Sequence, residues 1–118
     1  MTTKVLVVED EPLVRMLAVD LVDDAGLEAL EACNADDAIE VLSRTPDIGI
    51  LMTDINMPGS MDGLKLAEVA RTACPSIEIV VVSGRQSLDP GKLPERSVFL
   101  PKPYDIHKLS QLLLKMAA

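Results

Sequence analysis

Three carboxylates in the sequence follow closely on apolar segments. Glu9 and Asp10 come after the first apolar run, and Asp54 comes just after a later one. Runs of this kind predict strands that are buried on both faces of a parallel sheet. Pro58 and its polar neighbours then predict a loop, which places Asp54 at the carboxyl end of its strand, where ligands bind in open α/β sheets. The three side chains are therefore candidates for one acidic site, although a lone Asp54 could simply cap a turn.

Two more polar side chains stand at the ends of apolar runs, namely Ser83 and Lys102. Carboxylates gathered at one edge of a sheet repel and raise one another's pKa unless a cation lies among them, and oxygen ligands suit Mg²⁺. A lysine ammonium and a hydroxyl that face the same cluster suit a transferred phosphoryl group. The alternative interpretations are a surface lysine and a residue that caps a strand end.

The elements that must position these residues alternate between strand and helix. Strands are predicted at 4–8, 28–32, 48–52, 77–82 and 97–100, and helices at 13–25, 34–44, 63–73 and 105–116. The strand at 28–32 is weak in composition and is predicted at an edge, and Ile106 is predicted to face inward. This order predicts an α/β fold, with a doubly wound five-stranded parallel sheet in the order 2-1-3-4-5 and helices on both faces.

Length and charge narrow the classes of function. A chain of 118 residues predicts one domain, 1–118. Its 11 basic and 19 acidic residues give a net charge of −8, which argues against direct contact with nucleic acid and favours cationic partners or a metal. Because no apolar run has the length of a membrane span and the start lacks a signal-peptide pattern, we expect a cytoplasmic protein without membrane contact. Cys33 and Cys74 are expected to be free thiols.

Taken in order, these residues resemble the receiver domain of two-component response regulators. The resemblance rests on the acid pair Glu9-Asp10, on Asp54 with MPGSMDG downstream, on Ser83 after VVV, and on Lys102-Pro103, and it covers essentially the whole chain. It implies a signalling domain, not an enzyme that turns over a substrate. We expect a stand-alone receiver, the alternative being a domain excised from a larger kinase or regulator. Its expected partners are a sensor histidine kinase or a histidine phosphotransfer protein, together with a downstream protein target.

The resemblance also implies a role for each site residue. Asp54 would accept the phosphoryl group from a phosphohistidine. The carboxylates of Asp10 and Asp54 and the backbone carbonyl of Asn56 would hold Mg²⁺ (or Mn²⁺), while Glu9 would act through water.

On the other side of the site, Ser83 and Lys102 would bind the phosphoryl oxygens. Ser83 and Phe99 would form the switch that responds to phosphorylation. The peptide bond between Lys102 and Pro103 is a candidate for the cis form.

The sequence departs from the family pattern in four places. Glu9 stands where aspartate is common, the loop MPGSMDG is one residue longer than usual, and Phe99 lacks a hydroxyl, so a switch there would work by packing. The segment 84–96 is short and contains Pro90 and Pro94, which disfavour helical geometry before them. We therefore expect a shortened or irregular fourth helix.

Three other functions compete with this interpretation. An aspartate-nucleophile phosphohydrolase shares the chemistry, but its D-x-D motif follows the first strand, where this chain has E-D-E. A flavin or nucleotide binder would need a glycine-rich loop after Val8, which the sequence lacks. A receiver that no longer accepts phosphate is disfavoured by the presence of Asp54 and Lys102. His107 has no partner at a catalytic spacing, and we expect a surface or packing role for it.

Overall fold

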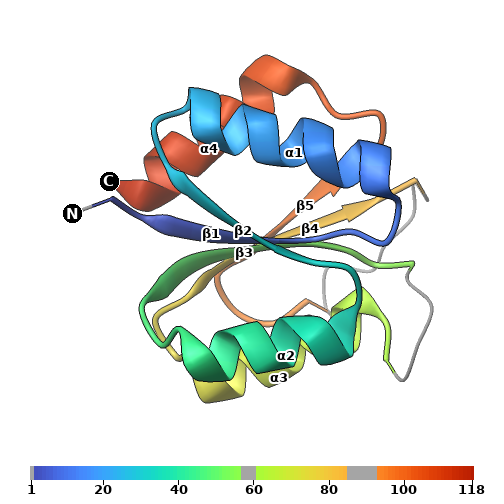
Figure 1. Cartoon of the computed structure of the whole chain (residues 1–118), viewed down its shortest axis with the longest axis vertical. Helices are drawn as coiled ribbons and strands as arrows, with labels where there is room; N and C mark the ends of the chain where they lie inside the picture. Colours follow the sequence, from blue (N-terminus) through green and yellow to red (C-terminus); the bar gives the residue numbers. More distant parts are fainter. Residues whose placement is uncertain (1, 57–60, 85–92) are drawn as a thin grey trace.

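A computed structural model of the chain describes residues 2–56, 61–84 and 93–118. Five parallel strands form one sheet in the order β2-β1-β3-β4-β5, so the predicted doubly wound fold is confirmed (Figure 1). The strands are β1 (Lys4–Val8), β2 (Glu28–Ala32), β3 (Ile48–Asp54), β4 (Glu78–Ser83) and β5 (Ser97–Pro101). The helices are α1 (Pro12–Asp24), α2 (Ala35–Arg44), α3 (Gly63–Ala73) and α4 (Ile106–Ala117).

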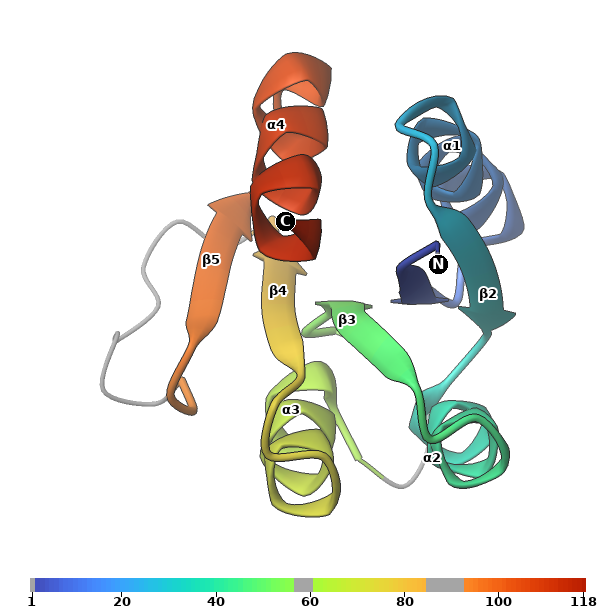
Figure 2. The ribbon, with the colours of Figure 1, turned by 90° about the vertical axis from the view of Figure 1, so that its left-hand side faces the viewer.

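The helices cover the sheet from both sides. Figure 2 shows α1 and α4 over one face and α2 and α3 over the other. Along β1 the side chains alternate between these two layers: Val5 and Val7 belong to the core beneath α1 and α4, whereas Leu6 and Val8 belong to the core above α2 and α3. A strand that is buried on both faces has to be apolar throughout, which explains the continuous run in the sequence.

Side-chain caps fix where three of the helices begin. The Asn34 side chain accepts a hydrogen bond from the Asp37 amide at 2.8 Å before α2. Asp62 and Asp105 do the same at the starts of α3 and α4. Each cap satisfies an amide that the first turn of a helix leaves without a partner. The helices that follow β2, β3 and β5 therefore start at defined points next to the carboxyl edge of the sheet.

The prediction that Ile106 faces inward was wrong. Ile106 is 64% exposed and lines a groove between α1 and α4, because it lies in the first turn of α4, whereas Leu109 and Leu113 further along the helix are fully buried. In α1, similarly, Leu13 and Leu17 are 73% and 67% exposed, because Ala18, Leu21 and Val22 form the stripe that packs on the sheet.

Other expectations concern single segments. Cys33 and Cys74 are free thiols, as predicted. Within the described ranges, no helix combines the length and apolar character needed to cross a membrane; the cytoplasmic location remains a prediction. The expected irregular fourth helix falls largely on residues 85–92, and the extra loop residue on 57–60, both of which lie outside the described residues.

Candidate functional site

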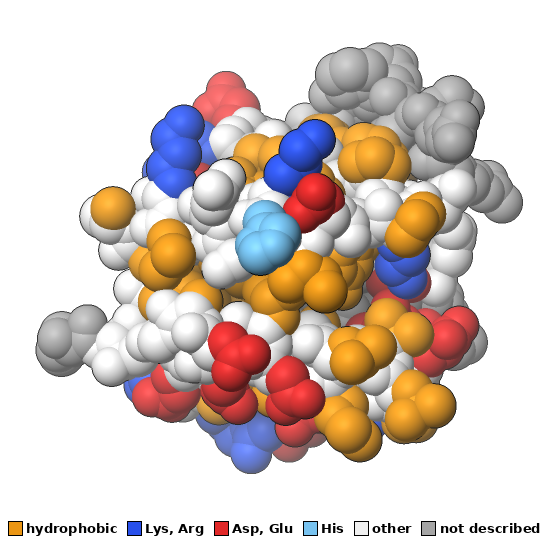
Figure 3. Space-filling model, turned by 90° about the horizontal axis from the view of Figure 1, so that it is seen from above, with side chains coloured by type: hydrophobic (Ala, Val, Ile, Leu, Met, Phe, Trp, Pro, Cys, Tyr) orange, Lys and Arg blue, Asp and Glu red, His pale blue; other side chains and the backbone are white. Residues whose placement is uncertain are grey.

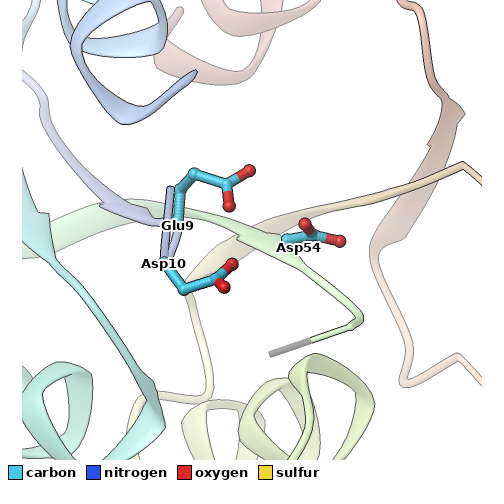
Figure 4. A group of neighbouring side chains, drawn as sticks. All are labelled: Glu9, Asp10 and Asp54. Atoms are coloured by element: carbon cyan, nitrogen blue, oxygen red, sulfur yellow. The ribbon is translucent and has the colours of Figure 1, made fainter. Parts of the chain in front are cut away.

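The acid cluster forms where β1 and β3 end side by side. Val8 pairs with Thr53, so Glu9 and Asp10 emerge next to Asp54. The three carboxylates lie close together at this edge of the sheet (Figure 4), and one ligand oxygen from each lies within 4.8 Å of the others. The structure therefore brings together the three acids that the sequence analysis had assigned to one site.

Lys102 reaches into this cluster from beyond β5. Its Nζ lies 2.8 Å from Asp54 Oδ2 and 3.0 Å from Glu9 Oε1, so one ammonium donates to two carboxylates. Burial lowers the pKa of Lys102, but the hydrogen bonds to Asp54 and Glu9 outweigh it, and the pKa lies above the ordinary 10.5. Lys102 therefore stays charged at neutral pH and offsets part of the negative charge of the cluster.

The end of β4 sets the place of Lys102. Ser83 pairs with Pro101, and the Ser83 carbonyl accepts a hydrogen bond of 2.7 Å from the Lys102 amide. The peptide bond from Lys102 to Pro103 is cis. Ser83 itself is 1% exposed and lies one residue beyond Val82, which pairs with Asp54. Ser83 and Lys102 thus occupy adjoining strand ends next to the acid cluster.

Glu9 is the most buried of the three acids, with 5% of its surface exposed. Burial raises the pKa of its carboxyl, and the hydrogen bond from Lys102 offsets part of that rise. The Glu11 amide also donates to Glu9 Oε2 at 3.2 Å. Burying a carboxylate costs free energy unless partners of this kind compensate its charge. A cation bound at the site would compensate the negative charge that remains.

The Asp54 carboxylate is held from its own loop. The Asn56 amide donates to Asp54 Oδ1 at 3.2 Å, so Asn56 lies beside the cluster as expected. The Asp54 side chain is only 11% exposed. Phe99, in contrast, is half-buried on β5 and packs with the core above α2 and α3. Phe99 therefore belongs to this core layer, and its role as a switch stays a prediction.

Sequence reasoning missed three residues that shape the site. The Thr53 hydroxyl donates to the Asp54 carbonyl at 3.0 Å, and Gly63 lies so close to that carbonyl that an added Cβ would overlap it. Tyr104 lines a small cavity together with Glu9, Asp54 and Lys102, and burial raises the pKa of its phenol. Of the three, only Gly63 left a signal in the sequence, as the glycine that closes MPGSMDG.

The donor set fits a small divalent cation. Carboxylate oxygens are the ligands that Mg²⁺ and Mn²⁺ accept, and three of them converge here around a site whose charge Lys102 offsets only in part. The described residues of this cluster offer no thiolate or imidazole ligand, which argues against a zinc-like site.

Comparison with known proteins identifies the family. The family model described as the response regulator receiver domain matches residues 5–114 of the chain. The chain belongs to the response regulator receiver domains. This membership makes it a signalling domain of a two-component system, in agreement with the resemblance in the sequence.

Solved receiver domains share the fold over nearly the full chain. The receiver domain of the hybrid histidine kinase CckA is 31% identical with a TM-score of 0.84, covering 98% of this chain and 99% of that one. A response regulator receiver protein from Pseudomonas putida is 30% identical with a TM-score of 0.86, covering 98% of each chain. One from Sinorhizobium medicae WSM419 is 26% identical with a TM-score of 0.91, covering 98% and 94%.

Curated relatives are longer proteins that contain a receiver domain. The sensor kinase CckA of Brucella abortus is 33% identical over 116 residues, which is 95% of this chain but 12% of the relative. The glycerol metabolism activator of Pseudomonas putida is 33% identical over 85 residues, which is 70% of this chain and 38% of the relative. The receiver domain therefore matches only a minor part of the length of each.

Proposed function

We propose that this receiver domain accepts a phosphoryl group on Asp54 from the phosphohistidine of a sensor histidine kinase or a histidine phosphotransfer protein. The observation that carries the proposal is the ammonium of Lys102 bonded to the Asp54 carboxylate, inside a cluster of two further acids. We also propose that residues 1–118 act as one receiver domain, which the family match over 5–114 supports.

The proposed reaction is an in-line displacement at phosphorus. An oxygen of Asp54 forms a bond to the phosphorus as the bond from phosphorus to the donor imidazole nitrogen breaks, and that nitrogen keeps the electron pair. The product is an acyl phosphate. Lys102 moves its hydrogen bond from the free carboxylate to a phosphoryl oxygen, and the Ser83 hydroxyl binds another, so both stabilise charge where it develops.

The metal in this proposal is Mg²⁺ or Mn²⁺. Asp10 and Asp54 would hold it with their carboxylates, Asn56 with its backbone carbonyl, and Glu9 through water. When bound, the ion would neutralise charge on the phosphoryl oxygens and orient them toward Asp54. Lys102 and the buried Glu9 keep the site ordered before the ion arrives.

An apolar surface beside the site supports a protein as donor. Figure 3 shows hydrophobic side chains gathered on the face formed by α1 and α4. Leu17 and Ile106 line the groove between these helices, and the same groove reaches Lys102 and Tyr104, which also line the site. A phosphohistidine on a helical partner would reach Asp54 from this side, with the apolar face supplying contact area.

The output step in the proposal is a change in packing. Phosphorylation draws the Ser83 hydroxyl toward the phosphoryl group, and β5 with Phe99 follows because Ser83 and Lys102 are joined by their backbones. The downstream partner then reads the altered face around Phe99.

The test is phosphorylation by a small donor that needs no kinase. Wild type incubated with acetyl phosphate and Mg²⁺ should gain one phosphoryl group by intact mass, and Asp54→Asn should gain none while keeping its circular dichroism spectrum. Asp23→Asn, an exposed aspartate near the far end of α1, is the matched control and should be labelled like wild type. Full labelling of Asp54→Asn would refute the assignment, and steady turnover of the donor without a labelled intermediate would indicate a phosphohydrolase.

A further inference from the structure

Arg15 connects three elements around the acid pair. Its Nη1 donates to the backbone carbonyl of Glu9 at 2.9 Å, and its Nε donates to Glu31 Oε1 at 3.2 Å. The arginine belongs to α1, Glu9 to the end of β1, and Glu31 to β2. The Arg15 side chain is 21% exposed, whereas that of Glu31 is 54% exposed. Arg15 is therefore better shielded from solvent than the glutamate it bonds.

The contact with Glu9 acts on the peptide unit between the two acids. The Glu9 carbonyl and the Asp10 amide share one plane, so holding the oxygen fixes the direction in which the chain enters Asp10. On the other side, the Glu9 amide donates to the Ala32 carbonyl at 3.1 Å. The peptide groups on both sides of Glu9 are thereby held, the second of them by the guanidinium of Arg15.

We infer that Arg15 is a positioning residue for the metal site: it holds the peptide between Glu9 and Asp10 so that the Asp10 carboxylate faces Asp54. Glu31 orients Arg15 by fixing Nε, which leaves Nη1 aimed at the carbonyl. A guanidinium suits this task because its donors have a fixed geometry. The inference rests on the proposed function, since it concerns the same metal ligands.

Charge and position predict opposite effects of removing Arg15. If the guanidinium acted only as a positive charge near the acids, it would repel Mg²⁺. Arg15→Met would then strengthen Mg²⁺ binding, because that repulsion would be removed. If Arg15 positions Asp10, the same substitution weakens Mg²⁺ binding. Removing groups that orient metal ligands lowers affinity about tenfold or more, and we expect a loss of that order.

In the experiment, Mg²⁺ is titrated into the metal-free protein. Calorimetry measures the Mg²⁺ affinity, and NMR records the signal of the Asp10 backbone amide. Arg15→Met should show the tenfold loss and a shifted Asp10 amide before any metal is added. Arg15→Lys keeps the charge but not the paired donors, and should show a smaller loss in the same direction, as should Glu31→Ala. Arg44→Met removes an equal charge at the end of α2 and should match wild type.

The outcomes separate this inference from the proposed function. An Mg²⁺ affinity in Arg15→Met that equals or exceeds that of wild type overturns the inference, whether or not the Asp10 amide shifts, and leaves phosphorylation of Asp54 untouched. If wild type binds no Mg²⁺, the proposed metal site fails, and the inference about its ligands fails with it. If Arg15→Met does not fold, Arg15→Lys decides, and an affinity equal to wild type overturns the inference. A purely structural role would lower the urea midpoint without changing the Mg²⁺ affinity of the folded protein.

Discussion

The ammonium of Lys102 donates hydrogen bonds to two carboxylates at once. It thereby neutralises part of the negative charge of the acid cluster. In the proposed function, the ammonium would compete with a metal ion for Asp54 and would face the phosphoryl group after transfer. Competition for Asp54 would weaken Mg²⁺ binding, whereas contact with the phosphoryl group would speed phosphorylation. A single substitution of Lys102 separates these two effects.

We expect Lys102→Met to keep or increase the affinity for Mg²⁺ while slowing phosphorylation by acetyl phosphate about 100-fold. The affinity holds because the ammonium no longer competes for Asp54, and the rate falls because one group that stabilises the transition state is lost. Calorimetry and a time course of intact mass measure the two effects. Lys108→Met, an exposed lysine on α4, should change neither quantity, and an unchanged rate in Lys102→Met would make Lys102 a surface residue.

Glu9 makes folding stability depend on pH in the acidic range. Burial raises the pKa of this carboxyl above its ordinary 4.5, so the folded state binds the proton more tightly than the unfolded state does. The stability that comes from the protonated form is therefore fully present below pH 4.5 and is lost as the pH rises through the folded pKa. At neutral pH and without metal, the ionised Glu9 lowers the free energy of unfolding.

Glu9→Gln should therefore be more stable than wild type in metal-free buffer at about pH 7, with the difference shrinking toward about pH 4. The amide carries no charge. Its single oxygen can still accept from Lys102 in place of Oε1, and its NH2 group takes the place of Oε2 and loses the hydrogen bond from the Glu11 amide, a loss that does not vary with pH. Urea unfolding across this range measures the difference, and Glu11→Gln, a neighbouring exposed glutamate, is the control. A difference that does not vary with pH would show that the charge of Glu9 is fully compensated.

At the scale of elements, the start of α3 packs directly on the strand that carries Asp54. The Gly63 amide donates to the Ile55 carbonyl at 2.9 Å, and a Cβ at Gly63 would overlap the Asp54 carbonyl. The helix can approach this closely only because residue 63 has no side chain. The position of Asp54 therefore depends on α3 as well as on β3.

We expect Gly63→Ala to lower the free energy of unfolding by about 2–3 kcal/mol, because α3 has to move away from a backbone atom that cannot yield. Urea denaturation measures the loss. Gly84→Ala is the control, since a Cβ there would meet nothing within 4 Å. Equal stabilities for the two variants would mean that α3 shifts at little cost.

The sequence was sufficient to predict most elements because their signals are local. Continuous apolar runs predicted β1, β3 and β4, and the capping residue Asn34 predicted the start of α2. The sequence did not predict that Leu13 and Leu17 on α1 are exposed, because these residues continue the helical spacing of the buried ones.

The site was predictable only in part for a related reason. Glu9 and Asp10 follow β1 and Asp54 ends β3, so the topology brings the three carboxylates together. The contacts of Arg15 with Glu31 and of Gly63 with Asp54 arise where elements approach each other, and no periodicity encodes that approach.

For the whole molecule, the net charge of −8 and the acid cluster lead us to expect that divalent cations increase stability. At a hundred times its dissociation constant, Mg²⁺ should stabilise wild type by about 2.7 kcal/mol, which is on the order of 10 °C in Tm. Asp10→Asn should lose most of this gain, and Asp23→Asn should keep it. NaCl at matched ionic strength accounts for screening, and an equal Tm increase with NaCl would mean that no specific site is involved.

The outer edge of β2 carries a consequence for how the molecule meets others. The strand has five residues, and the side chains of Glu28 and Glu31 on it are exposed. A short edge strand with charged side chains is a poor template for a strand from another chain. A polypeptide that added itself to the sheet here would have to place its backbone beside carboxylates. This edge therefore disfavours self-association by strand addition.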